Sequence, residues 1–251
     1  NDVPNVGAFN GKLDEVSVND QTLSAPLVKQ HYNDGVYGLH RGYVNCNSNI
    51  VKIMPLGDSI TSGSGGSRQG GYRRSLARLL AKAGYRYDFV GRLDDAGEPF
   101  DSNHEGWSGY TIDDIVKNIN AGLNANLPDV ILLHIGTNGV RDSSGLEKII
   151  DIVESFNEEI TVVVARIINN KTPNSATQVF NDEVEKIVIS RAANGSRLLL
   201  VDMGTALMPS DMNDEEHPVD SGYSKMAAVW FNGLSTFLPL CGNQSSIVPV
   251  I

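Results

Sequence analysis

The sequence predicts a three-layer α/β/α sandwich with a central, mainly parallel sheet of about five strands. Three observations lead to this prediction. From residue 50 onward, short apolar runs alternate with segments of helical periodicity. The runs "VILLHIG" and "ITVVVARII" are continuously apolar, which is typical of parallel strands covered on both faces. A chain of 251 residues with 41% hydrophobic content can also bury one sizeable core.

The elements follow one another in regular order. The expected strands lie at residues 51–56, 87–91, 129–135, 160–167 and 197–203. The expected helices lie at residues 72–83, 112–123, 145–156, 178–192 and 222–237. The first helix has one apolar face, formed by Tyr72, Leu76, Leu79, Leu80 and Ala83. Thr111 or Asp113 is expected to cap the second helix, and Ser221 the last.

Residues 1–40 differ from the rest and are expected to form an appended segment before a main domain at residues 41–251. They contain a short strand pattern, a turn, and a short helix that Ser24 would cap. This segment resembles the closing part of a laminin-G-like, concanavalin-type jelly roll, whose remainder is missing here. Alone it is too small to bury a core.

The charge balance restricts the partners. The formal net charge is −10 and the isoelectric point about 4.9. Nucleic acids and anionic membranes attract basic patches, so we expect neither as a partner. No apolar run approaches the length of a membrane span.

Several features favour a secreted protein. The two cysteines, Cys46 and Cys241, lie at opposite ends of the main domain and are expected to form a disulfide. The chain begins at Asn1 and not at Met, so we expect that a leader has been removed. A cytosolic protein with two unrelated thiols remains the alternative. Three triplets have the form of glycosylation acceptors, beginning at Asn170, Asn194 and Asn243.

The stretch "VKIMPLGDSITSGSGG" ends an apolar run at Gly57-Asp58-Ser59. It could be a plain strand-to-loop turn, a phosphate cradle or a nucleophile. A dinucleotide cradle needs glycine at its first, third and sixth positions, and Arg68 occupies the sixth. The other phosphate loop needs Gly-Lys-Ser/Thr, and no lysine follows Gly70 or Gly71. A cradle is therefore disfavoured.

A nucleophilic serine needs a histidine base and an acid that orients it. His217 has Asp214 three residues earlier, so one helical turn would bring the two side chains together. In isolation, an Asp-x-x-His pattern is more often a solvated acidic turn than a functional pair. The other histidines belong to a strand, to a loop that could line a pocket, or to the appended segment and its linker: His134, His104, His31 and His40.

The positions of the motifs along the chain favour the interpretation of Ser59 as a nucleophile. Gly57-Asp58-Ser59 follows the first expected strand, Gly136-Thr137-Asn138 the third, and the Asp214–His217 segment the last. In an open parallel sheet, sites form outside the carboxyl ends of the strands, so these motifs should meet at one edge. The loop "HEGWSGYTIDD" reaches the same edge and brings Gly109.

These four blocks resemble those of the SGNH, or GDSL, hydrolase family, over residues 51 to about 238. The resemblance implies a flavodoxin-like fold with Ser59 as nucleophile on an exposed turn, His217 as base and Asp214 as its orienting acid. The oxyanion hole would comprise the backbone N–H groups of Ser59 and Gly109 and the side-chain amide of Asn138. No cofactor and no metal are implied. Gly139 departs from the family pattern, which often has Asp there.

Four longer blocks, "VKIMPLGDSIT", "GGYRRSL", "YDFVGRL" and "HEGWSGYTI", resemble carbohydrate esterase family three, the acetylxylan esterases. This implies removal of acetyl groups from xylan or related plant polysaccharides through an acyl-enzyme. Asp58, Trp107 and Tyr110 are the candidate substrate-binding residues. Trp107 and Tyr110 could stack on a sugar ring, or could pack beneath their own loop.

Two other functions remain open at this stage. A lipid or lysophospholipid esterase would share the triad, but should have an apolar loop near the site, whereas these loops are glycine-rich, polar and acidic. A non-catalytic carbohydrate-binding protein would have no use for a triad. The acidic run "SDMNDEEH" could attract calcium, but it lacks EF-hand spacing.

Overall fold

The computed structural model describes residues 50–139 and 141–238. The expected appended segment, Cys46, Cys241 and the acceptor triplet at Asn243 lie outside the described residues. The described part forms one six-stranded sheet in which every pairing is parallel. The strands are β1 (Val51–Gly57), β2 (Tyr87–Phe89), β3 (Glu105–Gly106), β4 (Val130–His134), β5 (Thr161–Arg166) and β6 (Leu198–Asp202).

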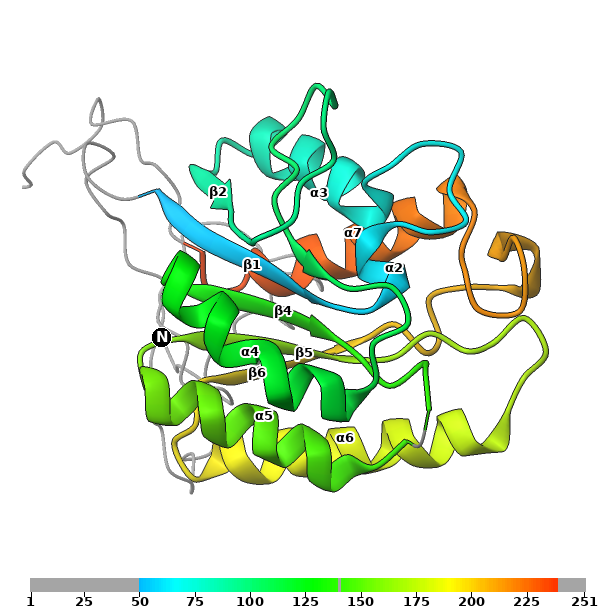
Figure 1. Cartoon of the computed structure of the whole chain (residues 1–251). Coiled ribbons are helices and arrows are strands. Elements are labelled where there is room, and N and C mark those ends of the chain that lie inside the picture. Colours follow the sequence, from blue (N-terminus) through cyan, green and yellow to red (C-terminus); the bar gives the residue numbers. More distant parts are fainter. Residues whose placement is uncertain (1–49, 140, 239–251) are drawn as a thin grey trace, which may run out of the picture.

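The strand order is β2-β1-β4-β5-β6, and β3 pairs with the last residues of β1. Helices cover both faces (Figure 1). One face carries α2 (Ser59–Ser62), α3 (Gly71–Lys82) and α7 (Asp220–Leu234). The other carries α4 (Ile112–Asn126), α5 (Ser143–Phe156) and α6 (Ser175–Ala193). A short 3₁₀ helix, η1 (Pro209–Asp211), follows β6. The predicted three-layer sandwich is therefore confirmed.

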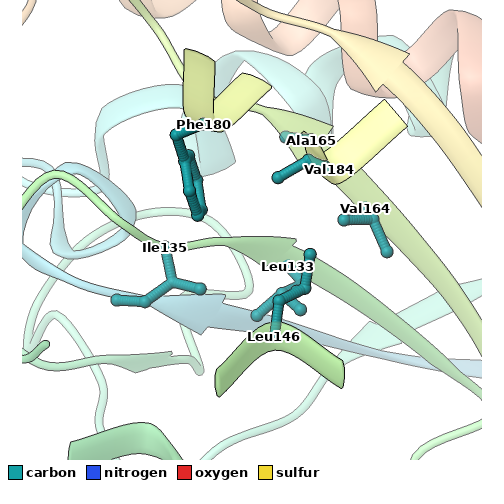
Figure 2. A pocket seen from close by; sticks show the side chains of 7 residues that line it. All are labelled: Leu133, Ile135, Leu146, Val164, Ala165, Phe180 and Val184. Atoms are coloured by element: carbon teal, nitrogen blue, oxygen red, sulfur yellow. The ribbon is translucent and has the colours of Figure 1, made fainter. Parts of the chain in front are cut away.

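The continuous apolar runs reflect this double cover. Successive residues of β4 point to opposite faces, so Leu132 packs under α3 and α7 while Leu133 packs under α4, α5 and α6. Figure 2 shows the second core where β4 and β5 meet α5 and α6, with the Phe180 ring lying against Ile135. Only hydrophobic side chains line the small pocket there, so it offers no polar group to orient a ligand.

The elements differ from the sequence predictions mainly at their ends. All five expected strands and five expected helices are present, and α2, β3 and η1 are additional. Thr111 caps α4 through a reciprocal pair of hydrogen bonds with Asp114, as expected. The predicted cap at Ser221 is wrong, because α7 begins at Asp220 after Val219, which offers no capping side chain. In the described residues, no helix is long and apolar enough to cross a bilayer.

Candidate active site

Ser59 is the first residue of the short helix α2, directly after β1. Asp58 caps this helix, because its Oδ1 accepts a hydrogen bond from the backbone N–H of Ile60 at 2.9 Å. Ser59 is only 7% exposed, so the expectation of an exposed turn is wrong. The Oγ of Ser59 faces His217 in the loop after β6.

His217 lies on a tight loop between Met212 and Pro218, which are paired as an isolated bridge. This is not the helical turn that we expected. Asp214 shapes the loop, because its Oδ1 accepts the backbone N–H groups of Glu216 at 2.9 Å and His217 at 2.8 Å. The same carboxylate therefore orients the backbone of the base as well as its ring.

The side chains of Ser59, His217 and Asp214 form a continuous chain of hydrogen bonds, which we call the relay. His217 Nε2 lies 2.9 Å from Ser59 Oγ, and His217 Nδ1 lies 3.0 Å from Asp214 Oδ2. Burial would raise the pKa of the Asp214 carboxyl, but the two backbone N–H groups and the imidazole outweigh it and lower this pKa to about 2. The carboxylate is therefore ionised wherever histidine is neutral, and the imidazole can take the serine proton.

Two further loops carry the candidate oxyanion donors. The backbone N–H of Trp107 donates to Gly57 O at 2.9 Å, which fixes the loop of Gly109 to the end of β1. Asn138 Nδ2 donates to Tyr110 O at 3.0 Å, which joins the loop after β4 to the same segment. These bonds hold Gly109 and Asn138 next to one another, and Gly139 follows with a left-handed φ of +70°. Their role in an oxyanion hole stays a prediction.

Comparison with known proteins agrees with this geometry. The profile of the GDSL-like Lipase/Acylhydrolase family matches residues 56–225, which is more than half of the chain. The chain belongs to this family. The matched residues contain Ser59, Asn138, Asp214 and His217, so they include every residue of the relay.

Three relatives place this GDSL-family chain more closely. A solved family 3 carbohydrate esterase of Clostridium thermocellum is 36% identical, with a TM-score of 0.69, covering 76% of this chain and 98% of that one. The predicted likeness to carbohydrate esterase family three is therefore confirmed. A multidomain esterase of Ruminococcus flavefaciens is 28% identical over 75% of this chain and 29% of its own length. A putative endoglucanase X of Acetivibrio thermocellus is 27% identical over 54% of this chain and 62% of its own length. The chain thus spans under two thirds of both curated relatives.

Asp58, the middle residue of the GDSL-family motif, lies beneath the nucleophile. Its side chain is 0% exposed, and Oδ2 has no hydrogen-bond partner among the described residues. Burial raises the pKa of the Asp58 carboxyl to about 6. A substrate-binding side chain has to reach the surface, so the geometry assigns Asp58 to support of Ser59 and not to the expected contact with substrate.

Trp107 and Tyr110 stack on one another, with ring centroids 5.4 Å apart and an angle of 17° between the planes. The guanidinium of Arg92 lies 5.1 Å from the centre of the Trp107 ring. Glu105, which is buried, accepts hydrogen bonds from Trp107 Nε1 at 2.9 Å and Arg92 Nε at 2.9 Å. The two aromatic rings thus form a fixed wall, and their contact with a sugar stays a prediction.

Sequence reasoning missed Arg73, whose fully buried side chain supports α2. Its guanidinium donates to Thr61 O and Ser62 O at 3.0 Å each, and forms an ion pair with Asp95 at 2.7 Å. A signal was present, because Arg73 shares helical spacing with Leu76 and Leu80 and so lies on the apolar face. A charged residue on such a face needs a buried partner.

The other described histidines do not join the relay. His134 is fully buried, accepts a hydrogen bond from Ile168 N–H at 3.3 Å, and has its pKa lowered by burial to about 4. His104 is also buried, and burial together with nearby Arg73 lowers its pKa to about 3. Within residues 50–139 and 141–238, no cluster of three or more His, Cys, Asp or Glu side chains could hold a metal ion.

Proposed function

We propose that the protein is a serine esterase that removes acetyl groups from acetylated xylan or a related plant polysaccharide, and that it acts outside the cell. The single observation that supports the reaction type most directly is the relay of Ser59, His217 and Asp214, with contacts of 2.9 and 3.0 Å. Membership of an esterase family and likeness to a family 3 carbohydrate esterase support the substrate class.

The residues account for each step of an acyl transfer. His217 Nε2 takes the Ser59 proton as Oγ attacks the acetyl carbonyl. The backbone N–H groups of Ser59 and Gly109 and the amide of Asn138 would stabilise the tetrahedral oxyanion. The intermediate collapses to acetyl-Ser59 as its bond to the sugar oxygen breaks, and that oxygen takes the proton from His217 and leaves as the sugar hydroxyl. A water molecule then repeats the sequence and releases acetate.

The half-buried stacked rings of Trp107 and Tyr110 and the net charge of −10 agree with a neutral, extended sugar polymer. The resemblance to acetylxylan esterases implies a small acyl pocket. We therefore expect acetyl esters to be cleaved much faster than butyryl or longer esters. A lipid esterase, the alternative from the sequence, would show the opposite order.

The test is acetate release from acetylated xylan by wild-type protein and Ser59→Ala, alongside p-nitrophenyl acetate and p-nitrophenyl octanoate. Acetate release that disappears in a folded Ser59→Ala supports the proposal. A preference for octanoate transfers the proposal to a lipid esterase. Polysaccharide binding without acetate release from any ester would support a non-catalytic binding protein instead.

A further inference from the structure

The glycine–serine run after the nucleophile helix packs on the loop of the catalytic base. Gly65 has a left-handed φ of +87°, and a Cβ there would lie 2.6 Å from His217 Cβ and 3.0 Å from Pro218 O. Only a residue without a side chain fits at this distance. The backbone at Gly65 is therefore in direct contact with His217, the candidate base.

Two side chains of α7 fasten the same run. Asp220 accepts the backbone N–H of Ser67 at Oδ1, at 2.8 Å, and the Ser67 hydroxyl at Oδ2. Tyr223, one turn further along the helix and 2% exposed, donates its hydroxyl to Ser64 O at 2.5 Å. Asp220 and Tyr223 lie three and six residues after His217. They therefore anchor the glycine–serine run to α7, the helix that follows the loop of His217.

The other end of the run is attached to the nucleophile. The backbone N–H groups of Gly63 and Ser64 both donate to Ser59 O, at 2.9 and 3.0 Å. The contacts therefore form a closed ring. The run is bonded to Ser59 O at one end and to Asp220 and Tyr223 of α7 at the other, and it contacts His217 at Gly65. His217 Nε2 in turn lies 2.9 Å from Ser59 Oγ. We call residues 63–67 with Asp220 and Tyr223 the loop clamp.

We propose that the loop clamp sets the position of His217 against Ser59, with Gly65, Ser67, Asp220 and Tyr223 as positioning residues. None of them contacts the reacting atoms. The base needs such support because its loop is short and open: the side chain of Asp214 is 51% exposed and that of His217 is 21% exposed. The proposal rests on the proposed function, since it concerns the same serine–histidine pair.

The first experiment compares Gly65→Ala with Gly84→Ala. Gly84 has nearly the same φ, +79°, but a Cβ there meets nothing within 4 Å. Both variants place alanine at a similar left-handed φ, and only Gly65→Ala presses on His217. We expect Gly65→Ala to lower kcat for p-nitrophenyl acetate by about 10²-fold, the effect of a misplacement near 1 Å, and to slow organophosphonate labelling of Ser59 in parallel. KM should change by less than about twofold.

The second experiment is a double-mutant cycle on Ser67→Ala and Asp220→Ala. Ser67→Ala loses the hydroxyl bond to Asp220 Oδ2 and keeps the backbone bond, whereas Asp220→Ala loses both. Each should lower kcat by about 3–10-fold, Asp220→Ala by more, and the double variant should be no slower than Asp220→Ala alone. Asp113→Ala is the control, because it also removes an acidic residue from the first turn of a helix, α4, without a contact to the clamp.

A crystal structure of Gly65→Ala gives a readout that needs no substrate. We expect His217 Nε2 to lie beyond hydrogen-bond reach of Ser59 Oγ, more than about 3.5 Å away. If Gly65→Ala matches Gly84→Ala in kcat, labelling rate and His217 position, the clamp has no positioning role. Wild-type protein that neither hydrolyses acetyl esters nor labels at Ser59 overturns the proposed function instead, and the His217 position still decides the clamp.

Discussion

At the scale of single residues, Asn138 uses one amide hydrogen before any substrate binds. Its Nδ2 donates to Tyr110 O at 3.0 Å, and among the described residues no bond is formed by the second N–H, which can point at a ligand. A donor set in this way stabilises charge that develops in the transition state and needs no rearrangement. Asn138→Ala should therefore lower kcat by about 10²–10³ and change KM much less.

Steady-state kinetics on p-nitrophenyl acetate checks this, with Asn124→Ala as a control. Asn124 also donates from Nδ2 to a backbone carbonyl, Asn120 O at 2.7 Å, but it is exposed on α4. If Asn138→Ala raises KM and leaves kcat unchanged, the amide contributes to ground-state binding of the substrate and is not part of the oxyanion hole.

Asp58 links stability to pH. Burial raises the pKa of its carboxyl to about 6, above its usual unfolded value near 3.9. Its stabilising contribution is therefore complete below pH 4 and is lost as pH rises from 4 to 6, since the folded state must then ionise a buried group. Asp58→Asn keeps an N-cap oxygen but cannot ionise. Relative to wild type, we expect it to gain on the order of 2–3 kcal/mol in unfolding free energy between pH 4 and pH 7.

Denaturant unfolding of both proteins at the two pH values measures this difference. The carboxylate of Asp214, whose lowered pKa stabilises the fold above pH 4, is present in both proteins and cancels. Equal differences at pH 4 and pH 7 would show that Asp58 titrates at an ordinary pKa despite its burial.

At the scale of elements, α6 constrains the loop that carries Asn138. Gly136 follows β4 with a φ of +125°, and a Cβ there would lie 2.7 Å from the Phe180 ring. Figure 2 shows that ring over the end of β4, beside Ile135. Gly136→Ala should destabilise the protein by about 1–3 kcal/mol through overpacking, in addition to its backbone strain, and should lower kcat by moving Asn138.

Thermal unfolding and kinetics of Gly136→Ala, Phe180→Leu and the double variant test this coupling. The smaller side chain should relieve part of the clash, so the double variant should be more stable than the sum of the single effects predicts. Gly195→Ala, with φ +100° and open space around its Cβ, reports backbone strain alone. Strict additivity would show that Phe180 does not limit this loop.

The long elements could be predicted because their signals extend over many residues. β4 and β5 are buried on both faces, and α4 has a capping box, so their type was evident from the sequence. α2 has four residues and β3 two, which is too short for any periodicity to appear. Their existence depends on tertiary contacts, such as the bonds from buried Arg73 to the carbonyls of α2.

The candidate site was predictable for a topological reason. Motifs after β1, β4 and β6 had to meet at the carboxyl edge, and the structure brings Ser59, His217 and Asp214 into contact there. What could not be predicted is the support around them. The contact of Gly65 with His217 joins residues far apart in sequence through a backbone conformation, and no pattern of residue types reports such a contact.

At the scale of the whole molecule, the candidate site lies at the carboxyl ends of the strands. The start of β1 and the end of α7 lie at the opposite edge of the sheet. The strands run toward the site, and α7 starts beside it and runs back along the sheet (Figure 1). The first strand residue, Val51, and Phe237, after α7, pack against the same hydrophobic core. Residues near both described ends therefore belong to one core.

This arrangement bears on the predicted bridge between Cys46 and Cys241, which lie four residues before Ile50 and three residues after Leu238. Segments of that length can extend about 14 and 10 Å, and the bridge stays a prediction. The bridge would close a loop of nearly the whole domain, worth about 5 kcal/mol in the chain-entropy model. We expect native protein from an oxidising host to gain two mass units on reduction, and Cys46→Ser to lose several degrees in Tm. Two thiols that alkylate without reduction would contradict the bridge and weaken the proposal of secretion.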